Sequence, residues 1–210
     1  DFISPIIDFL SSIGINFFGS DPVSAGFGLF NAGGIIFMII GIGLSKMLAD
    51  KYGKRNVFGV FLFISTLFIL VFYVLSPDSI NLIFGAQIFH GFFYGITIPL
   101  LWAMIADVAD YSEWKNNRRA TAIIFSAMMV GLKLGLSIGG ALVASILGSY
   151  GYVPNSVGEQ TESAILGTKM LVSIFPSIPF LVAAALLFFY VIDKKMEDKI
   201  EQDLLKKRKS

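Results

Sequence analysis

Long apolar stretches follow one another along the chain, separated by short polar breaks. A helix needs about 20 residues to cross roughly 30 Å of hydrocarbon. Six stretches approach or exceed that length: residues 2–19, 23–45, 56–76, 80–106, 120–148 and 165–192. None shows the alternation of apolar and polar positions that a strand of a membrane barrel carries. The pattern predicts an all-α membrane protein with six transmembrane helices.

The two ends of the pattern set the predicted domain organisation. Residues 1–192 are expected to form one transmembrane unit, and the highly charged residues 193–210 a tail. The first stretch is short and contains Asp8 and Asn16, as a helix clipped at its N-terminus would. The chain opens with Asp1 and has no basic segment followed by a short apolar run and a cleavage site, so we expect an internal start without a signal peptide.

Composition agrees with lipid as the solvent. The chain is 55% hydrophobic and only 15% charged, with a mean hydropathy of +0.76, whereas a soluble domain has about 25% charged residues. This balance excludes soluble enzymes. A net charge of +1 gives no reason to expect a nucleic-acid partner. With no cysteine and one histidine, neither a Cys-ligated metal nor a multi-histidine zinc site is expected.

The basic residues predict an orientation. Fourteen of the 16 lie in three segments, residues 46–55, 115–119 and 194–209. All three segments fall on one side if six helices alternate across the membrane. Because cytoplasmic loops carry an excess of Lys and Arg, we expect both ends of this chain in the cytoplasm.

Lys133 stands near the middle of the fifth stretch, about 20 Å from either end at 1.5 Å per residue. An unpaired ammonium at that depth costs roughly 2.5–3.5 kcal/mol even on lenient insertion scales. We therefore expect Lys133 to face a water-filled cavity or a carboxylate. Two interpretations follow: a role in binding substrate or coupling ion, or a structural ion pair inside the bundle.

Other polar residues fall on helical stripes that could line the same cavity. The fourth stretch has such a stripe at spacings of 3, 4 and 3, formed by Gln87, His90, Tyr94 and Thr97. Asn31 of the second stretch and Ser126, seven residues before Lys133, are further candidates. The alternative interpretation of each stripe is hydrogen bonding between helices, worth about 0.6 kcal/mol per contact.

Glycines of the fifth stretch form a separate pattern. Gly131, Gly135 and Gly139 repeat every four residues on nearly the opposite side from Lys133, and such a ridge allows another helix to approach closely. Gly135-x-Ser137-x-Gly139 also matches the motif of a serine nucleophile. That motif belongs at a strand-to-helix turn, and the four-residue repeat accounts for these glycines without catalysis. We expect no enzyme and no catalytic residue.

The junction after the fourth stretch concentrates charge. Its carboxylates are Asp107, Asp110 and Glu113, followed by Arg118 and Arg119. Acids at the C-terminal end of a helix oppose its macrodipole, so a partner must compensate them. A solvated loop that pairs with itself is the alternative.

These residues resemble a known family. The pattern is Asp107-x-x-Asp110-Tyr111-x-Glu113-x-Lys115, then Arg119, then Phe125-Ser126 with Lys133 seven residues beyond that serine. It is similar to the glycoside–pentoside–hexuronide:cation symporters, the melibiose-carrier group of the major facilitator superfamily. The break at residues 48–55 also resembles the short cytoplasmic motif of that superfamily between helices 8 and 9.

The resemblance implies a carrier of two six-helix halves, of which this chain matches the C-terminal half, helices 7 to 12. Lys133 matches the lysine that links sugar and cation binding. Asp107 and Arg119 match charges that bridge to the other half, so the charged junction is expected to act as a cytoplasmic gate. The coupling ion, Na⁺ or H⁺, would bind mainly in the N-terminal half, and no other cofactor is expected.

The combined prediction is a fragment of a secondary active transporter that symports a sugar with Na⁺ or H⁺ by alternating access, in a bacterial inner membrane. Its partners would be the lipid bilayer, a glycoside, pentoside or hexuronide, and the N-terminal half. Two alternatives remain: a polytopic membrane module that transports nothing, and a drug or lipid facilitator of the same superfamily.

The tail has its own pattern. Met196, Ile200 and Leu204 are spaced four apart and give a thin apolar stripe on a charged helix. Such a helix is expected either to be solvated or to lie against the inner leaflet.

Overall fold

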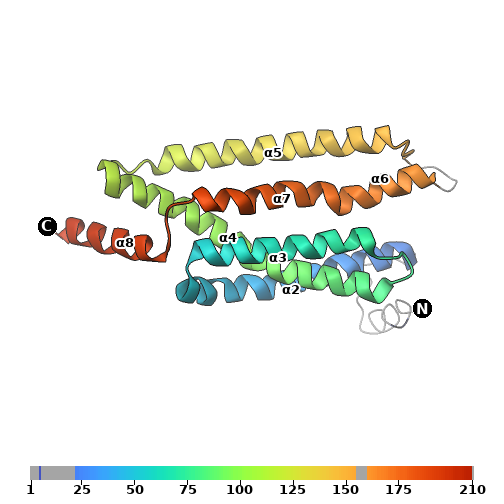
Figure 1. Ribbon diagram of the computed structural model, residues 1–210, viewed down its shortest axis with the longest axis horizontal. Helices are drawn as coiled ribbons and strands as arrows, with labels where there is room; N and C mark the ends of the chain where they lie inside the picture. The colour runs from blue at the N-terminus through green and yellow to red at the C-terminus, as the bar shows by residue number, and fades with distance from the viewer. Residues whose placement is uncertain (1–4, 6–21, 155–159, 210) are drawn as a thin grey trace.

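The computed structural model describes residues 22–154 and 160–209, together with residue 5, and is helical throughout those ranges apart from short turns (Figure 1). The long helices are α2 (Pro22–Tyr52), α3 (Lys54–Val74), α4 (Ile80–Asn116) and α5 (Thr121–Ser149). The remaining elements are α6 (Glu162–Val172), α7 (Ile174–Leu186), the 3₁₀ turn η1 (Leu187–Phe189) and α8 (Lys194–Lys209). The all-α prediction is confirmed.

Five of the six predicted membrane segments have a counterpart among the described residues. Helices α2, α3, α4 and α5, and the run from Glu162 to Phe189, are each long and apolar enough to cross a bilayer. The predicted stretch 2–19 lies outside the described residues. The run from Glu162 is broken at Ser173, which has φ −125° and ψ −73°. Pro176 follows in the next turn and has no N–H for the carbonyl of Val172, so the helical ladder is interrupted there.

Helix α4 continues to Asn116, whereas the apolar pattern predicted an end near residue 106. Its last turns are charged, but they pack against α8, where Ile200 and Leu204 are only 4% and 5% exposed. Because tertiary packing replaces the missing hydrophobic pattern, the helix extends beyond the segment that hydropathy defines.

Helices α2 and α4 pack in close contact through glycines. A Cβ atom at Gly91 would overlap the carbonyl of Gly34, and one at Gly95 would overlap the carbonyl of Met38. Beside this contact, a cluster of buried apolar side chains joins α3 to α4, with Leu62 and Ile96 at 3% and 1% exposure. These three helices therefore form one packed unit.

Helix α5 lies at the edge of the molecule in Figure 1, and none of its residues is buried. Gly131, Gly135 and Gly139 form the predicted ridge. A Cβ atom added at any of them would meet no neighbouring atom within 4 Å. Within the described part of the chain, no helix occupies that face.

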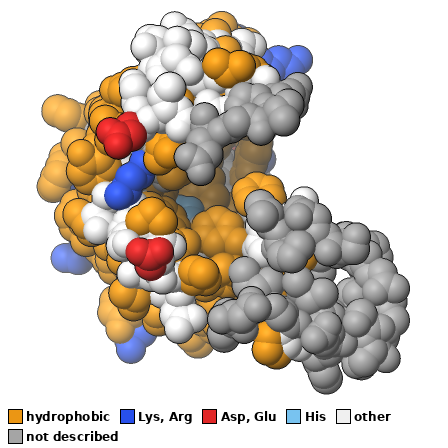
Figure 2. All heavy atoms as spheres, turned by 90° about the vertical axis from the view of Figure 1, so that its right-hand side faces the viewer, with side chains coloured by type: hydrophobic (Ala, Val, Ile, Leu, Met, Phe, Trp, Pro, Cys, Tyr) orange, Lys and Arg blue, Asp and Glu red, His pale blue; other side chains and the backbone are white. Residues whose placement is uncertain are grey.

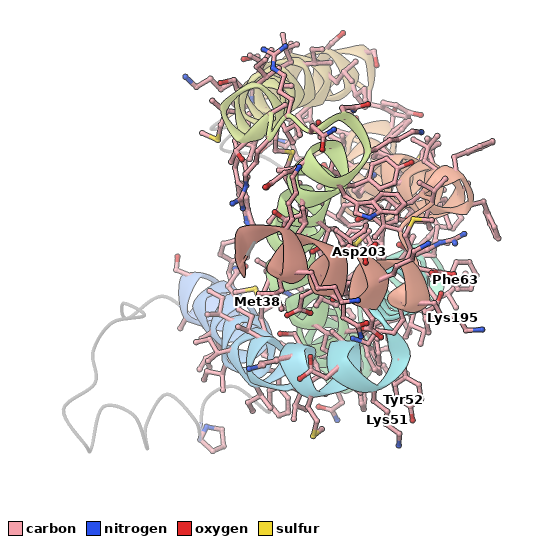
Figure 3. All side chains as sticks on the ribbon, turned by 90° about the vertical axis from the view of Figure 1, so that its left-hand side faces the viewer. Met38, Lys51, Tyr52, Phe63, Lys195 and Asp203 are labelled. Carbon is pink, nitrogen blue, oxygen red and sulfur yellow. The ribbon has the colours of Figure 1, made fainter. Side chains whose placement is uncertain are left out.

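The three basic segments lie together at one end of the molecule, as the sequence predicted. The C-terminal ends of α2 and α4, the N-terminal ends of α3 and α5, and α8 meet at one end of the molecule (Figure 1), which we call the basic end. Figure 3 looks onto this end and shows α8 lying across it. Lys169 is near the other end, where its Nζ donates to the carbonyl oxygen of Leu75 at 3.2 Å.

Candidate functional site

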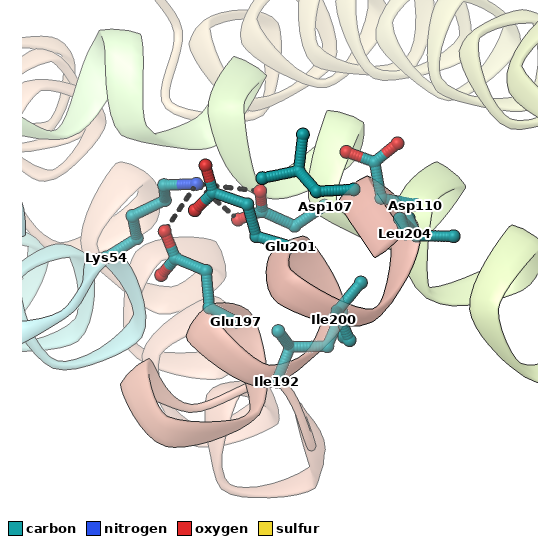
Figure 4. A pocket seen from close by; sticks show the side chains of 9 residues that line it. Lys54, Asp107, Asp110, Ile192, Glu197, Ile200, Glu201 and Leu204 are labelled. Atoms are coloured by element: carbon teal, nitrogen blue, oxygen red, sulfur yellow. Dashed lines mark hydrogen bonds and ion pairs between the residues drawn. The ribbon is translucent and has the colours of Figure 1, made fainter. Parts of the chain in front are cut away.

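Three helices bring a lysine and two carboxylates together at the basic end. Lys54 is the first residue of α3, and its Nζ donates to both oxygens of Asp107 on α4, at 2.7 and 2.8 Å. The same Nζ lies 3.1 Å from Oε1 of Glu197 on α8 (Figure 4). The three side chains are 16–22% exposed. This Lys54–Asp107–Glu197 cluster is therefore largely shielded from water. Charge pairs in such a shielded position interact more strongly than pairs at the surface.

A polar recess of about 370 Å³ opens beside the cluster, between α4 and α8 (Figure 4). Asp110 and Glu201 line it together with the three clustered residues. Four carboxylates thus share a recess with one lysine, so the recess carries excess negative charge.

The second group of predicted gate residues lies beside this recess. Arg119 Nη2 is 3.0 Å from Oδ1 of Asp110, and its Nε is 3.8 Å from Glu113, with half of the arginine side chain exposed. Arg118 is exposed, and its carbonyl oxygen accepts a hydrogen bond from the Ser112 hydroxyl at 3.0 Å. The structure thus divides the five predicted gate residues into Asp107, bound to Lys54, and a more exposed group around Arg119.

The apolar stripe of α8 packs on α4 instead of facing solvent or lipid. Ile200 and Leu204 pack against Val108, Tyr111 and Trp114. These α4 residues are partly buried aromatic and branched side chains, and they offer the tail an apolar surface within the chain.

Polar contacts on both sides of this stripe fix the position of α8. Trp114 Nε1 donates to Oδ2 of Asp203 at 3.0 Å, and Lys207 Nζ donates to Oδ1 of Asn117 at 2.6 Å. The tail is therefore a structural part of the charged site. Neither a solvated tail nor one lying on the bilayer describes it.

Tyr190 links the end of the transmembrane helices to the cluster. Its hydroxyl donates to the carbonyl oxygen of Met104 at 3.2 Å. Burial raises the pKa of the Tyr190 phenol, and the negative charges of Asp107 and Glu197 raise it further. The phenol therefore stays protonated and remains a hydrogen-bond donor.

Three residues of the predicted polar stripe of α4 make contacts within the bundle. His90 Nδ1 lies 3.1 Å from the carbonyl oxygen of Ser65 on α3, so this ring nitrogen is the donor. The imidazole stacks on Tyr94 with ring centroids 5.7 Å apart, and Tyr94 stacks on Phe180 of α7 at 5.8 Å. Thr97 is 2% exposed and donates to the carbonyl of Tyr94 at 2.7 Å.

Two residues of this stripe also reach a cavity. A hollow of about 690 Å³ near the end opposite the basic end is lined by Gln87 and His90, by Lys169 and mostly by apolar side chains. Figure 2 looks onto that end of the molecule, where largely hydrophobic side chains surround the hollow. Two residues of the stripe thus line a hollow, but Lys133 is not among the residues that line it.

The remaining predicted cavity residues lie elsewhere. Asn31 Nδ2 donates to the carbonyl of Phe27 on its own helix at 2.9 Å. Ser126 and Lys133 are exposed on α5. No carboxylate of residues 22–154 or 160–209 lies within ion-pair distance of Lys133. The structure therefore does not bring Lys133 and the α4 stripe into one site.

The sequence does not indicate a site role for two residues of the Lys54–Asp107–Glu197 cluster. Lys54 is one of several cations in its segment, and Glu197 is one of several acids in the charged tail. The available signal was the stripe of Met196, Ile200 and Leu204, because an apolar stripe on a charged helix requires a surface to cover it.

Among the described residues, no group of three His, Cys, Asp or Glu could hold a metal ion.

Comparison with known proteins places this geometry in a family. Residues 9–194 match the profile of a family described as MFS/sugar transport protein. An uncharacterised symporter, YjmB, of Bacillus subtilis is 32% identical over 80% of this chain and 36% of its own length. The putative glycoside/cation symporter YagG of Escherichia coli is 30% identical over 78% of this chain and 35% of its own length.

A third relative, the isoprimeverose transporter of Lactiplantibacillus pentosus, is 29% identical over 94% of this chain and 41% of its own length. The chain thus spans well under half the length of these three relatives. Their names describe transporters, not enzymes, and the profile covers most of the chain, in agreement with the resemblance on the Asp107–Lys133 motif. This chain is a member of the MFS/sugar transport family, a group of integral membrane carriers.

Proposed function

We propose that this chain is part of a carrier that moves a glycoside, pentoside or hexuronide together with Na⁺ or H⁺ by alternating access. Support comes from relatives named as a glycoside/cation symporter, a glucuronide carrier homologue and an isoprimeverose transporter. Their greater length supports a second, N-terminal half that would supply the main cation site.

The observation that carries the proposal is the exposure of α5. This helix is apolar enough to cross a bilayer, yet Lys133 in its middle is exposed and has no carboxylate partner among the described residues. Intramembrane charges face the interior of a bundle or a water-filled cavity, because hydrocarbon is too costly for them. We place the sugar path against this helix, with Lys133 contacting the substrate or a carboxylate of the other half. Ser126 belongs to the same path.

The α4 and α2 residues have a secondary role in this proposal. Gln87 and His90 line the hollow near the end opposite the basic end. Tyr94, Thr97 and Asn31 lie on the same two helices and would shape the path through their packing.

We further propose that the basic end is cytoplasmic, in a bacterial inner membrane, and that its charges act as a gate. The accumulation of Lys and Arg at one end supports this orientation. Asp107, Asp110, Glu113, Arg118 and Arg119 would exchange partners with the N-terminal half when that side closes. Arg119 is half exposed and could exchange partners easily, whereas Asp107 would have to leave its shielded pair with Lys54 to do so.

The experiment is sugar uptake by the full-length carrier with Lys133→Ala. We expect accumulation against a gradient to fall at least tenfold while the amount of protein in the membrane is unchanged. Ile138→Ala is the matched control, because Ile138 is 57% exposed and carries no charge, and its position five residues after Lys133 puts it on a different face of the same helix. Normal coupled uptake by Lys133→Ala would contradict the proposal, and uncoupled flux in the parent protein would favour a facilitator.

A further inference from the structure

An apolar groove of about 560 Å³ runs between α3 and α7, on a surface that the proposed sugar path does not use. Its walls and floor are apolar or small side chains: Gly59, Val60 and Phe63 on α3, and Leu181, Ala184 and Phe188 on α7 and η1. Val60, Phe63 and Phe188 are 54%, 47% and 82% exposed, so the groove is open along its length. In a membrane-spanning bundle, an open apolar groove is filled by hydrocarbon.

One end of the groove is polar. Arg55 and Asn56 line it where α3 begins, at the basic end. From Arg55 to Ile64, the helix rises about 13 Å, which matches one leaflet of a bilayer core roughly 30 Å thick. The groove therefore has the length of one acyl-chain layer, with a guanidinium at the depth of the headgroups.

The end of α7 holds that guanidinium at the mouth of the groove. Arg55 Nε donates to the carbonyl oxygen of Leu187 at 3.1 Å, and its Nη2 donates to that of Phe188 at 3.4 Å. The helix ends there in a 3₁₀ turn, and the Leu187 carbonyl uses both lone pairs, because it also accepts from the Tyr190 N–H at 3.1 Å. A guanidinium has five N–H donors, so three remain for a ligand.

The guanidinium at the mouth favours an anion. Viewed along the bundle, Lys195 of α8 and Phe63 of α3 lie on the same side of the molecule (Figure 3). No carboxylate is among the described residues that line the groove. At the start of α8, Asp198 is paired with Lys194 at 2.9 Å. A planar guanidinium with free donors suits a phosphate, which it binds through two N–H groups at once.

We propose that this groove binds one anionic phospholipid, with an acyl chain along α3 and α7 and the phosphate on Arg55 and Asn56. Basic pockets between transmembrane helices can bind anionic headgroups through such contacts. The lipid would cover the apolar groove and hold α7 against α3 next to the break at η1. This inference uses neither Lys133 nor the gate, so it stands or fails independently of sugar transport.

The test is native mass spectrometry of the full-length carrier in detergent, titrated with phosphatidylglycerol or phosphatidylcholine of identical acyl chains. We expect at least a fivefold preference for phosphatidylglycerol in the parent protein, and less than twofold in Arg55→Gln. Lys46→Gln is the matched control, because Lys46 is an exposed cation of the same end that does not line the groove. It should retain the full preference.

A second pair of variants tests the groove itself, and it keeps the proposal testable if Arg55→Gln disturbs the fold. Val60→Trp fills the groove and should lower phosphatidylglycerol binding at least threefold. Leu67→Trp places the same ring on an exposed position of α3 outside the groove and should leave binding unchanged. Equal binding of the two lipids by the parent protein, or parental binding by Val60→Trp, would overturn the proposal.

Discussion

Helices α4 and α5 carry similar sequence patterns but have opposite surroundings. Each is long and apolar, with polar residues on a stripe and glycines every four residues, Gly91 and Gly95 on α4 and Gly131, Gly135 and Gly139 on α5. The α4 glycines touch the backbone of α2, whereas the α5 glycines have nothing within 4 Å. No residue of α5 is buried.

The difference shows that a sequence pattern indicates which contacts a helix can make, but not which residues provide them. Regularly spaced glycines permit a close approach, and polar residues in lipid need partners. On α4, the glycines touch the backbone of α2, and His90 donates to the Ser65 carbonyl on α3. For α5, the described residues supply neither. A partner outside this chain, such as the proposed N-terminal half, would supply the polar partner of Lys133, and the predictions below test whether the α5 glycines stay free of a close contact.

The largest expected effect comes from adding one methyl group to a glycine of α4, with the same change on α5 as the comparison. Gly91→Ala places a Cβ against the carbonyl of Gly34, and neither backbone can move aside cheaply. We expect a loss of about 3 kcal/mol of stability, at the upper end of ordinary overpacking. Gly135→Ala is the matched change on α5 and should be neutral or slightly stabilising, because alanine favours a helix by about 1 kcal/mol over glycine.

Thermal denaturation of the full-length protein in detergent measures both changes. If Gly91→Ala were as stable as the parent, the close contact between α2 and α4 would be disproved. If Gly135→Ala unfolded readily, α5 would be packed as tightly as α4, and the contrast between the two helices would not hold in the complete carrier.

A smaller effect is expected at the basic end, where α4 does have a partner from a distant part of the chain. Lys54→Met leaves Asp107 and Glu197 facing each other without their cation. Because the cluster is about one-fifth exposed, we expect a cost of about 2 kcal/mol, between the values of surface and buried pairs. Lys46→Met removes an exposed cation of the same end and should cost little.

Limited proteolysis reports whether α8 is released. In Lys54→Met, cleavage within residues 194–209 should become at least several times faster, because Glu197 would no longer anchor the tail. An unchanged cleavage rate would show that Ile200 and Leu204 hold α8 without the ion pairs.

Length and hydropathy were sufficient to predict the transmembrane helices that the structure describes, because burial in lipid demands about 20 apolar residues whatever the neighbours are. They were insufficient at the end of α4. Residues 107–116 mix charged side chains with Val108, Tyr111 and Trp114, on which α8 packs, and the sequence around α4 alone does not indicate that contact.

The charged site shows the same limit. The spacing of Asp107 and Asp110 predicted that a partner must compensate the acids at this helix end, but spacing identifies a face and not the residue opposite it. The partner of Asp107 is Lys54, 53 residues earlier in the chain. The stripe of Ile200 and Leu204 was located correctly, while the surface that it covers depends on α4. Whether Lys133 meets substrate stays a prediction, because α5 has no such surface in the described chain.

The smallest effect concerns Tyr190 and tests how closely α4 and the end of the last transmembrane helix are joined. Tyr190→Phe removes the hydrogen bond to the Met104 carbonyl, worth about 1 kcal/mol near neutral pH. The pKa of the Tyr190 phenol is raised in the folded protein, while an unfolded tyrosine ionises at about 10. Above that pH the unfolded chain therefore binds fewer protons than the folded one, and the stability contributed by Tyr190 falls as pH rises.

The phenylalanine variant lacks this loss, so its disadvantage relative to the parent should shrink between pH 8 and pH 11. Other tyrosines and the lysines titrate in both proteins and cancel in the difference between denaturation midpoints. Tyr52→Phe, at a position 53% exposed, reports the effect of losing a phenol away from the cluster. A gap between parent and Tyr190→Phe that stays constant to pH 11 would mean that the Tyr190 phenol is neither buried nor close to Asp107 and Glu197. The contact between α4 and the chain segment before α8 would then be looser than the structure describes.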